Sequence, residues 1–386
     1  MHRDPVPWAV IGIVILGLLA APWGQHAERT SRGSEQLRGV LGESNGTGSD
    51  GYARVTGPRA FEFPADHGAH PDYRSEWWYV TGNLRDGRGR AYGFQLTLFR
   101  FALAPEMPAR ASAWATRQAW MGHFAVTDIA SGRHIASERF QRGALGLAGT
   151  TLDPFRAWLD DWSMRSIADD GEGLFPMRLA ASTEDVALSL RLAATKPRLL
   201  QGEAGYSRKG NEPGNASYYY SYTRLRASGQ LRLDGGWRSV TGSAWLDREW
   251  STSSLGPQQT GWDWFALQLD DGRDVMVYRL RRQDGRTDPV SYGVVVGPEG
   301  QAHKMGPEGF DLQPQRRWTD PFDGARYPIV WRLRIPAHGI DARVRARVAD
   351  QLMDLGFRYW EGSVRVDPVG RDSGVGGVGY LEMTGY

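Results

Sequence analysis

The stretches that decide the fold are WWYVTGNLRDGR at residues 77–88 and WDWFALQLDDGR at residues 262–273. They align without a gap and share Trp, Leu, Asp, Gly and Arg at equivalent positions. In each stretch an aromatic-rich run ends in Asp-Gly, which is typical of a β-strand that enters a tight hairpin turn. Their spacing of 185 residues is far longer than a solenoid repeat. We therefore predict two domains of one β fold, the alternative being two hairpins that are similar by chance.

The rest of the sequence has the same β character. Alternating runs recur at residues 92–98, 186–193, 218–226, 245–250, 274–281, 329–335 and 341–348. Asp-Gly turns recur at residues 86, 234, 271 and 284, and the best helical candidate is the short stretch 154–162. This pattern predicts an all-β protein of two tandem antiparallel barrels or sandwiches. We place the boundary at Asp234-Gly235-Gly236, giving domains 57–235 and 236–386.

The N-terminus has the pattern of an export signal. A basic start is followed by WAVIGIVILGLLAA at residues 8–21, an uncharged run of 14 residues. This length suits a signal peptide and is short for the roughly 20 residues that span a bilayer. We predict a signal peptide or an N-terminal membrane anchor over residues 1–27 and a flexible tether over residues 28–56. The protein is then expected to be periplasmic or secreted, with a possible tether to the inner membrane.

Composition excludes several classes of function. The 386 residues carry a net charge of only +2, which argues against binding nucleic acid through bulk charge. The absence of Cys excludes thiol nucleophiles, disulfides, iron–sulfur clusters and Cys-ligated zinc. The stretch GVGGVG at residues 374–379 matches a dinucleotide-binding fingerprint but leaves no room for the helix that must follow. We expect no cofactor and no metal.

A loop just before the first repeat carries titratable side chains. His67 and His70 lie a few residues ahead of Glu76, which begins the aromatic strand. Such a loop fits a metal site, a metal-free polar or catalytic role, or structural hydrogen bonding. Glu76 is a general-acid candidate if it is buried without a cation, and the alternative is an ion pair with Arg74 or Arg100. His67 and Glu76 are thus candidate catalytic residues, and His70 is a candidate ligand-binding residue.

A second candidate is the strand WLDREW at residues 245–250. Trp245, Asp247 and Glu249 share one face, with alternate residues about 6.6 Å apart, and Arg248 points the other way. Two carboxyls beside an indole can have their pKa values pushed apart, giving one acid and one base. If this face met water, the two acids would be ordinary solvated charges. The flanking tryptophans favour an inward face, and we take Asp247 and Glu249 as catalytic candidates.

Aromatic side chains suggest a ligand cavity. Tyr218, Tyr220 and Tyr222 share one strand face, which fits either a lumen for an apolar ligand or a packed aromatic ladder. His123 is a lone strand histidine of lower rank. The candidate ligand-binding residues are Trp245, Tyr218, Tyr220, Trp77, Trp262, Trp264 and His70.

Seven stretches carry a resemblance to a known family: DHGAHPDYRSEWWYVTGNL (66–84), YGFQLTLFR (92–100), GHFAVTD (122–128), ASYYYSYTRL (216–225), GSAWLDREWSTS (242–253), GWDWFALQLDDGRDVMVYRLR (261–281) and GYLEMTGY (379–386). Together they resemble the AttH-like and carotenoid 1,2-hydratase family of secreted hydrolase-like proteins over roughly residues 55–386. The resemblance implies two lipocalin-like β domains. It also implies relatives that act on long apolar polyenes without a cofactor, by protonating a double bond with a carboxylic acid and adding water to the resulting cation.

The resemblance carries over to the site only in part. In the carotenoid hydratases the acid lies in a Tyr-x-Asp motif, with a His-x-Trp pair one strand earlier. Asp247 stands in the matching position, Trp245 replaces the Tyr, and Tyr218 and Tyr220 stand about where the His and Trp occur. The acid is retained and its partners differ, which fits the AttH-like branch better than carotenoid hydration.

Two main functional hypotheses follow. The first is a cofactor-independent hydratase or hydrolase acting on an apolar, isoprenoid-like molecule, with Asp247 as proton donor and Glu249, Tyr218 and Tyr220 orienting water or stabilising cationic charge. The second is a non-enzymatic carrier or chaperone for a lipid or other hydrophobic ligand, partnered with an envelope transporter. A third is a structural envelope protein with filled barrels.

Overall fold

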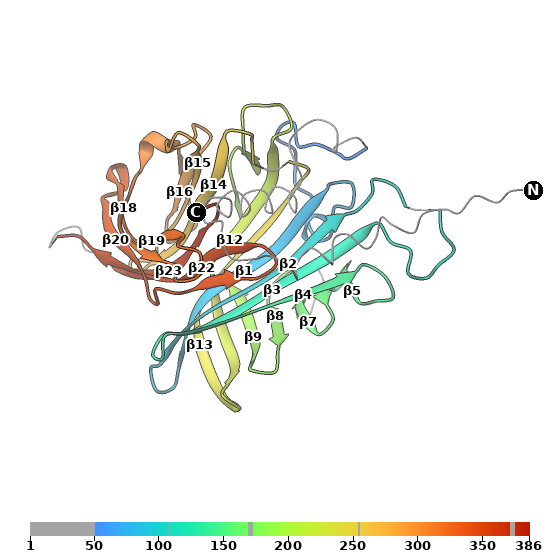
Figure 1. Ribbon diagram of the computed structural model, residues 1–386, viewed down its shortest axis with the longest axis horizontal. Coiled ribbons are helices and arrows are strands. Elements are labelled where there is room, and N and C mark those ends of the chain that lie inside the picture. Colours follow the sequence, from blue (N-terminus) through green and yellow to red (C-terminus); the bar gives the residue numbers. More distant parts are fainter. Residues whose placement is uncertain (1–50, 108, 169–172, 254, 371–374) are drawn as a thin grey trace, which may run out of the picture.

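The computed structural model describes residues 51–107, 109–168, 173–253, 255–370 and 375–386 (Figure 1). The predicted signal or anchor segment and most of the predicted tether lie outside the described residues. Helix within this part of the chain is limited to three single turns: η1 (Ala65–His67), η2 (Pro307–Gly309) and η3 (Pro336–His338). No helix in these ranges is long and apolar enough to cross a membrane.

The first sheet is antiparallel and curls on itself (Figure 1). Its long path runs β4-β3-β2-β1-β13-β12-β9-β8-β7-β6-β5, and β10 and β11 pair with β12. Its strands are β1 (Ser75–Asp86), β2 (Ala91–Ala102), β3 (Gln118–Asp128), β4 (Arg133–Arg142), β5 (Ala148–Leu152), β6 (Phe155–Leu159), β7 (Trp162–Ser166), β8 (Met177–Ser182), β9 (Val186–Ala194), β10 (Leu199–Leu200), β11 (Tyr206–Arg208), β12 (Ala216–Leu233) and β13 (Gly236–Ser251). β6 therefore occupies the stretch that was the best helical candidate.

The second sheet is also antiparallel and curled (Figure 1). Its path runs β17-β16-β15-β14-β23-β22-β20-β19-β18, and β21 pairs with β22. Its strands are β14 (Gln259–Leu269), β15 (Asp274–Arg282), β16 (Tyr292–Val296), β17 (Ala302–Met305), β18 (Asp311–Thr319), β19 (Arg326–Ile335), β20 (Ile340–Ala346), β21 (Leu352–Asp354), β22 (Arg358–Pro368) and β23 (Gly377–Met383).

The two sheets share one plan. In each, the first strand pairs with the last, β1 with β13 and β14 with β23, while its other edge forms a hairpin with the next strand. The sequence repeat is the strand-and-turn unit that opens each sheet, β1 with its turn and β14 with its turn. The prediction of an all-β chain with two tandem antiparallel β domains is confirmed.

The change of sheet comes later in the chain than the Asp-Gly signal suggested. Asp234 and Gly235 form the turn between β12 and β13, with φ angles of 53° and 72°. A two-residue type I′ hairpin requires positive φ at both central positions, and Asp and Gly adopt this conformation at lower energy than most residues. β13 thus stays in the first sheet, and the chain passes to the second between Ser251 and Gln259.

Buried apolar side chains form three clusters. One lies inside the first sheet and includes Trp78 and Trp250, and a second lies inside the second sheet and includes Trp331. The third draws from both sheets and contains Tyr79 and Trp264. β1 and residues 244–251 of β13 are therefore buried on both faces, with alternate residues entering different cores.

Polar contacts fix the two sheets against each other. Asn83 Nδ2 donates to the Gly379 carbonyl at 3.0 Å, and Lys196 pairs with Asp274 at 2.7 Å. Gly93 on β2 permits a close approach, because a Cβ there would lie 2.7 Å from that of Ser363. These contacts hold the space between the sheets in a defined shape.

Candidate active site between the two sheets

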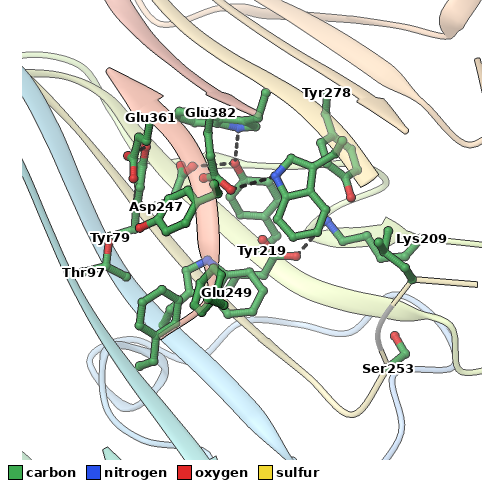
Figure 2. Close-up of a pocket in the computed structure, with 17 residues that line it drawn as sticks. Tyr79, Thr97, Lys209, Tyr219, Asp247, Glu249, Ser253, Tyr278, Glu361 and Glu382 are labelled. Atoms are coloured by element: carbon green, nitrogen blue, oxygen red, sulfur yellow. Dashed lines mark hydrogen bonds and ion pairs between the residues drawn. The ribbon is translucent and has the colours of Figure 1, made fainter. Parts of the chain in front are cut away.

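A cavity lies between the two sheets (Figure 2). Its empty space is about 930 Å³ when the open solvent at its mouth is included. Aromatic rings dominate its wall, and four carboxyl groups and one ammonium supply most of its charge. The charged residues are Asp247, Glu249, Glu361, Glu382 and Lys209.

The sequence repeat builds the aromatic wall. Trp77 and Tyr79 on β1 and their repeat equivalents Trp262 and Trp264 on β14 all line the cavity. The ring of Tyr79 meets that of Trp264 edge-on, with centroids 5.4 Å apart. Alternation along each strand sends these residues toward the other sheet and their neighbours into the sheet interiors. The repeat therefore places equivalent positions on the two sides of one site.

Asp247 is the most completely bonded acid of the site. Ser221 Oγ donates to its Oδ1 at 2.5 Å, Trp245 Nε1 donates to the same oxygen at 2.7 Å, and Tyr219 Oη donates to Oδ2 at 2.7 Å. Burial raises the pKa of Asp247 to about 7, although these three hydrogen bonds lower it, and the nearby charge of Glu249 adds to the rise. Asp247 can therefore hold a proton near neutral pH and release it inside an apolar cavity.

Glu249 lies two residues along the same face and differs in its partners. Lys209 Nζ approaches Glu249 Oε1 at 2.8 Å, and Ser217 Oγ donates to the same oxygen. The Lys209 ammonium also lies over the ring of Tyr278, 4.4 Å from its centroid. Glu249 therefore has a cation in direct contact, whereas Asp247 has only neutral donors.

The second sheet contributes two further acids. Glu361 on β22 and Glu382 on β23 are directly opposite in the strand register. Tyr79 Oη donates to Glu361 Oε1 at 2.5 Å, and Trp262 Nε1 donates to Glu382 Oε1 at 2.8 Å. Burial, and then the charge of Glu382, raises the pKa of Glu361 well above its usual range. Burial raises the pKa of Glu382 to about 7, against the hydrogen bond from Trp262.

Several predicted site residues meet here. Asp247 and Glu249 face the cavity as the alternation indicated, with Trp245 bonded to Asp247. Trp77, Trp262 and Trp264 also line it.

The tyrosine ladder does not face the cavity. The side chains of Tyr218 and Tyr220 lie in the core of the first sheet. The intervening Tyr219 enters the cavity and bonds Asp247. Because both faces of β12 are buried in this segment, its aromatic pattern could not show which face met the acids. The position expected for the acid's aromatic partners is therefore corrected by one residue.

The histidine loop lies on the other side of the first sheet from Asp247. His67 Nδ1 is 2.7 Å from Tyr220 Oη, and His70 stacks on Trp250 with ring centroids 3.8 Å apart. Burial, with the charges of Arg198 and Arg248, lowers the pKa of His67 to about 3. His67 is therefore a neutral group inside the first core.

Glu76 belongs to the same core. It is fully buried and pairs with Arg100 and with Arg248. Burial raises its pKa, but these two guanidiniums and the hydrogen bond from His70 outweigh burial and hold it well below its usual range. The expected ion pair with Arg100 is present, and the general-acid alternative is not supported because Glu76 stays ionised.

Sequence reasoning missed Tyr219, Lys209, Glu361 and Glu382. The available signal for the two glutamates was a lone acid in an otherwise apolar or aromatic strand, as in YWEGSV and YLEM. The described residues contain no group of three or more His, Asp or Glu arranged to hold a metal ion. His123 lies behind the cavity wall, with Nδ1 2.8 Å from Tyr359 Oη.

Fold and site define a class: an all-β protein of two curled sheets that enclose an aromatic, acid-lined cavity between them. The AttH-like family model matches residues 54–386. The chain belongs to the AttH-like family, as the sequence motifs indicated.

Solved structures agree with this assignment. A protein from Nitrosomonas europaea assigned as an AttH is 35% identical, with a TM-score of 0.75 and coverage of 86% of this chain and 99% of that one. Kievitone hydratase from Nectria haematococca is 13% identical, with a TM-score of 0.63 and coverage of 86% and 95%, a likeness that shows the fold. Comparison with curated protein sequences finds no match. The two curled antiparallel sheets and the likeness to the Nitrosomonas europaea structure agree with the expected lipocalin-like fold of the two tandem domains.

Proposed function

We propose that this protein is a cofactor-independent hydratase, or a hydrolase using the same acid, that acts on an apolar, isoprenoid-like molecule in the cavity between the sheets. The observation that carries the proposal is Asp247, a buried carboxyl with a pKa of about 7 that faces an aromatic cavity. A proton donor works best when its pKa lies near the working pH. Kievitone hydratase shares the fold, and the reaction class itself is argued from the site.

The chemistry needs only groups of this chain and water. The protonated Asp247 gives its proton to one carbon of a double bond, and the positive charge develops on the other carbon. The faces of rings such as Trp264 can stabilise that charge. Water then forms the new carbon–oxygen bond and loses a proton to the Glu249 carboxylate, which Lys209 holds in place. Tyr219 takes the supporting role first expected of Tyr218 and Tyr220, because it is the tyrosine bonded to Asp247.

The proposal is tested with isoprenoid alkenes and alcohols incubated in H₂¹⁸O. Wild-type protein is expected to produce an alcohol with one solvent oxygen, and Asp247→Asn, which keeps the side-chain shape, is expected to lose about a hundredfold or more of that rate. Asp185→Asn, an exposed turn residue, is the matched control. Equal turnover by Asp247→Asn would remove the proposed role of the acid.

A carrier is the second candidate, because the same aromatic cavity suits retention of a hydrophobic ligand. Its signature is stoichiometric ligand release with no chemical change, measured by native mass spectrometry of protein purified from its own envelope. An envelope transporter would be the natural partner of such a carrier. In either role we propose export to the periplasm or medium, on the basis of the N-terminal sequence pattern.

A further inference from the structure

The charges in the cavity are unevenly matched. Lys209 pairs with Glu249 at one end, over the rings of Tyr278 and Tyr219 at 4.4 Å and 5.5 Å from their centroids. At the other end, neither Glu361 nor Glu382 forms an ion pair with any described residue. The site therefore contains one ammonium held by a carboxylate and aromatic faces, and a second pair of carboxyls without such a cation.

Glu361 has one buried carboxyl oxygen that lacks a hydrogen bond of normal geometry. Its side chain is 1% exposed and lines the cavity, and Oε1 accepts the hydrogen bond from Tyr79. Oε2 is buried and accepts no hydrogen bond of normal geometry from the described residues, although the Tyr359 hydroxyl is close enough to lower the pKa of Glu361 as a donor. A buried carboxyl oxygen without a good hydrogen-bond partner is costly, so this atom has the capacity to contact a polar or charged group of a ligand.

We propose that the Glu361–Glu382 end of the cavity binds an organic monocation, such as the head group of a quaternary or tertiary ammonium compound. The neighbouring wall contains Trp262 and Tyr359, and aromatic faces beside carboxylates are the surroundings that attract ammonium groups. Lys209 shows the same arrangement within this cavity.

Without a bound cation, Glu361 and Glu382 favour their protonated, uncharged forms. Burial disfavours ionisation of both acids. The charge of Glu382 adds to this effect at Glu361, and the charges of Asp247 and Glu249 add to it at Glu382, whose pKa lies at about 7. A bound cation would favour the ionised forms, so binding should release protons. The other titratable groups around the pair are Asp247 and Glu249 from β13, Lys209 next to β11, Tyr79, Tyr219, Tyr278 and Tyr359 from the walls, and His123 behind Tyr359. Burial raises the pKa of all four tyrosines well above the usual value, so they stay neutral between pH 6 and 8.

The inference also deepens the proposed function. If the protein hydrates a double bond, the positive carbon formed on protonation is a cation of the kind this end would hold, and this link rests on the proposed reaction. Binding of a stable ammonium compound does not depend on that reaction. The two ideas can therefore fail separately.

The test compares choline with its uncharged isostere, 3,3-dimethylbutan-1-ol, by isothermal titration calorimetry of the wild-type protein. Choline is expected to bind at least about tenfold more tightly than the alcohol at pH 8. At pH 6, where the Glu382 carboxyl is mostly protonated, choline binding should release a proton, which is measured as a heat that varies with the buffer. Between pH 8 and pH 6 the affinity for choline should fall about tenfold, because a carboxyl with a pKa of about 7 changes from mostly ionised to mostly protonated. Equal binding of the two compounds, or no binding of choline, would overturn the proposal.

Variants locate the site. Glu361→Gln and Glu382→Gln should each remove the preference for choline while leaving the weak binding of the alcohol, and Glu308→Gln, an exposed residue of η2, should change neither. Preference for choline unchanged in both cavity variants would refute the assignment. The hydratase proposal is tested separately, by the turnover of Asp247→Asn. Failure of the cation-binding proposal would therefore leave the hydratase proposal standing, and the reverse also holds.

Discussion

Asp247→Asn is expected to stabilise the folded protein increasingly as pH rises. In the native state burial raises the pKa of Asp247 from its usual 3.8 to about 7. The native protein therefore binds this proton more tightly than the unfolded chain does. Stability from this group is fully present below about pH 4 and is lost as pH rises through 7, where ionisation must occur in the buried site.

The size of the effect follows from the two pKa values. One pKa unit is worth about 1.4 kcal/mol, so the full penalty above pH 7 is about 4 kcal/mol. At pH 5 only about 2 kcal/mol of that penalty is present, because the native carboxyl still holds its proton while the unfolded one is mostly ionised. Asn carries no charge at either pH. Its altered hydrogen bonds with Tyr219 and Ser221 cost the same at both, so the difference between variant and wild type should grow by roughly 2–3 kcal/mol from pH 5 to pH 8.

The assay is urea unfolding at pH 5 and pH 8, followed by tryptophan fluorescence, with Asp185→Asn as the exposed control. The control should show no pH-dependent difference from wild type beyond about 0.5 kcal/mol. A difference for Asp247→Asn that stays constant within the same margin would mean that Asp247 ionises normally, and the acid assignment would fail.

Two further predictions concern the groups on either side of the first sheet. Glu76→Gln is expected to cost about 3–5 kcal/mol in urea unfolding at pH 7, because it removes the carboxylate that Arg100 and Arg248 share in a buried core. The exposed Glu184→Gln is its control, and a loss under about 1 kcal/mol would contradict the ion-pair account. Tyr219→Phe is expected to raise the pKa of Asp247 above 7, because it removes a hydrogen bond to the carboxylate. Carbon-13 NMR of the labelled carboxyl would measure this, and an unchanged or lower pKa would count against the bond.

Much of the architecture could be predicted from local sequence. Alternation and Asp-Gly turns identify strands and hairpins, because side chains on a strand point to opposite faces and these turns need positive φ. The same logic placed Asp247 and Glu249 on one face. The turn at Asp234-Gly235 was predicted to be the domain boundary, but β13 follows it in the same sheet. A turn motif does not indicate whether the next strand stays in the same sheet.

The composition of the site depended on long-range packing. Most of β12 and β13 along the site is buried on both faces, so alternation separates the two faces without saying which one meets the cavity. Glu361 and Glu382 join Asp247 only because the second sheet packs on the first, a contact with no local signature. His67 and Glu76 lie on the other side of the first sheet from Asp247, and their burial beside arginines could not be predicted from the loop sequence.

The most direct test of the account is a carbon-13 titration of Asp247 in the intact protein, with its resonance assigned by comparison with Asp247→Asn. The account predicts that the Asp247 carboxyl titrates near pH 7, far above its usual 3.8. A carboxyl that is fully ionised at pH 5 would be no proton donor at neutral pH, and the proposed acid catalysis would be contradicted.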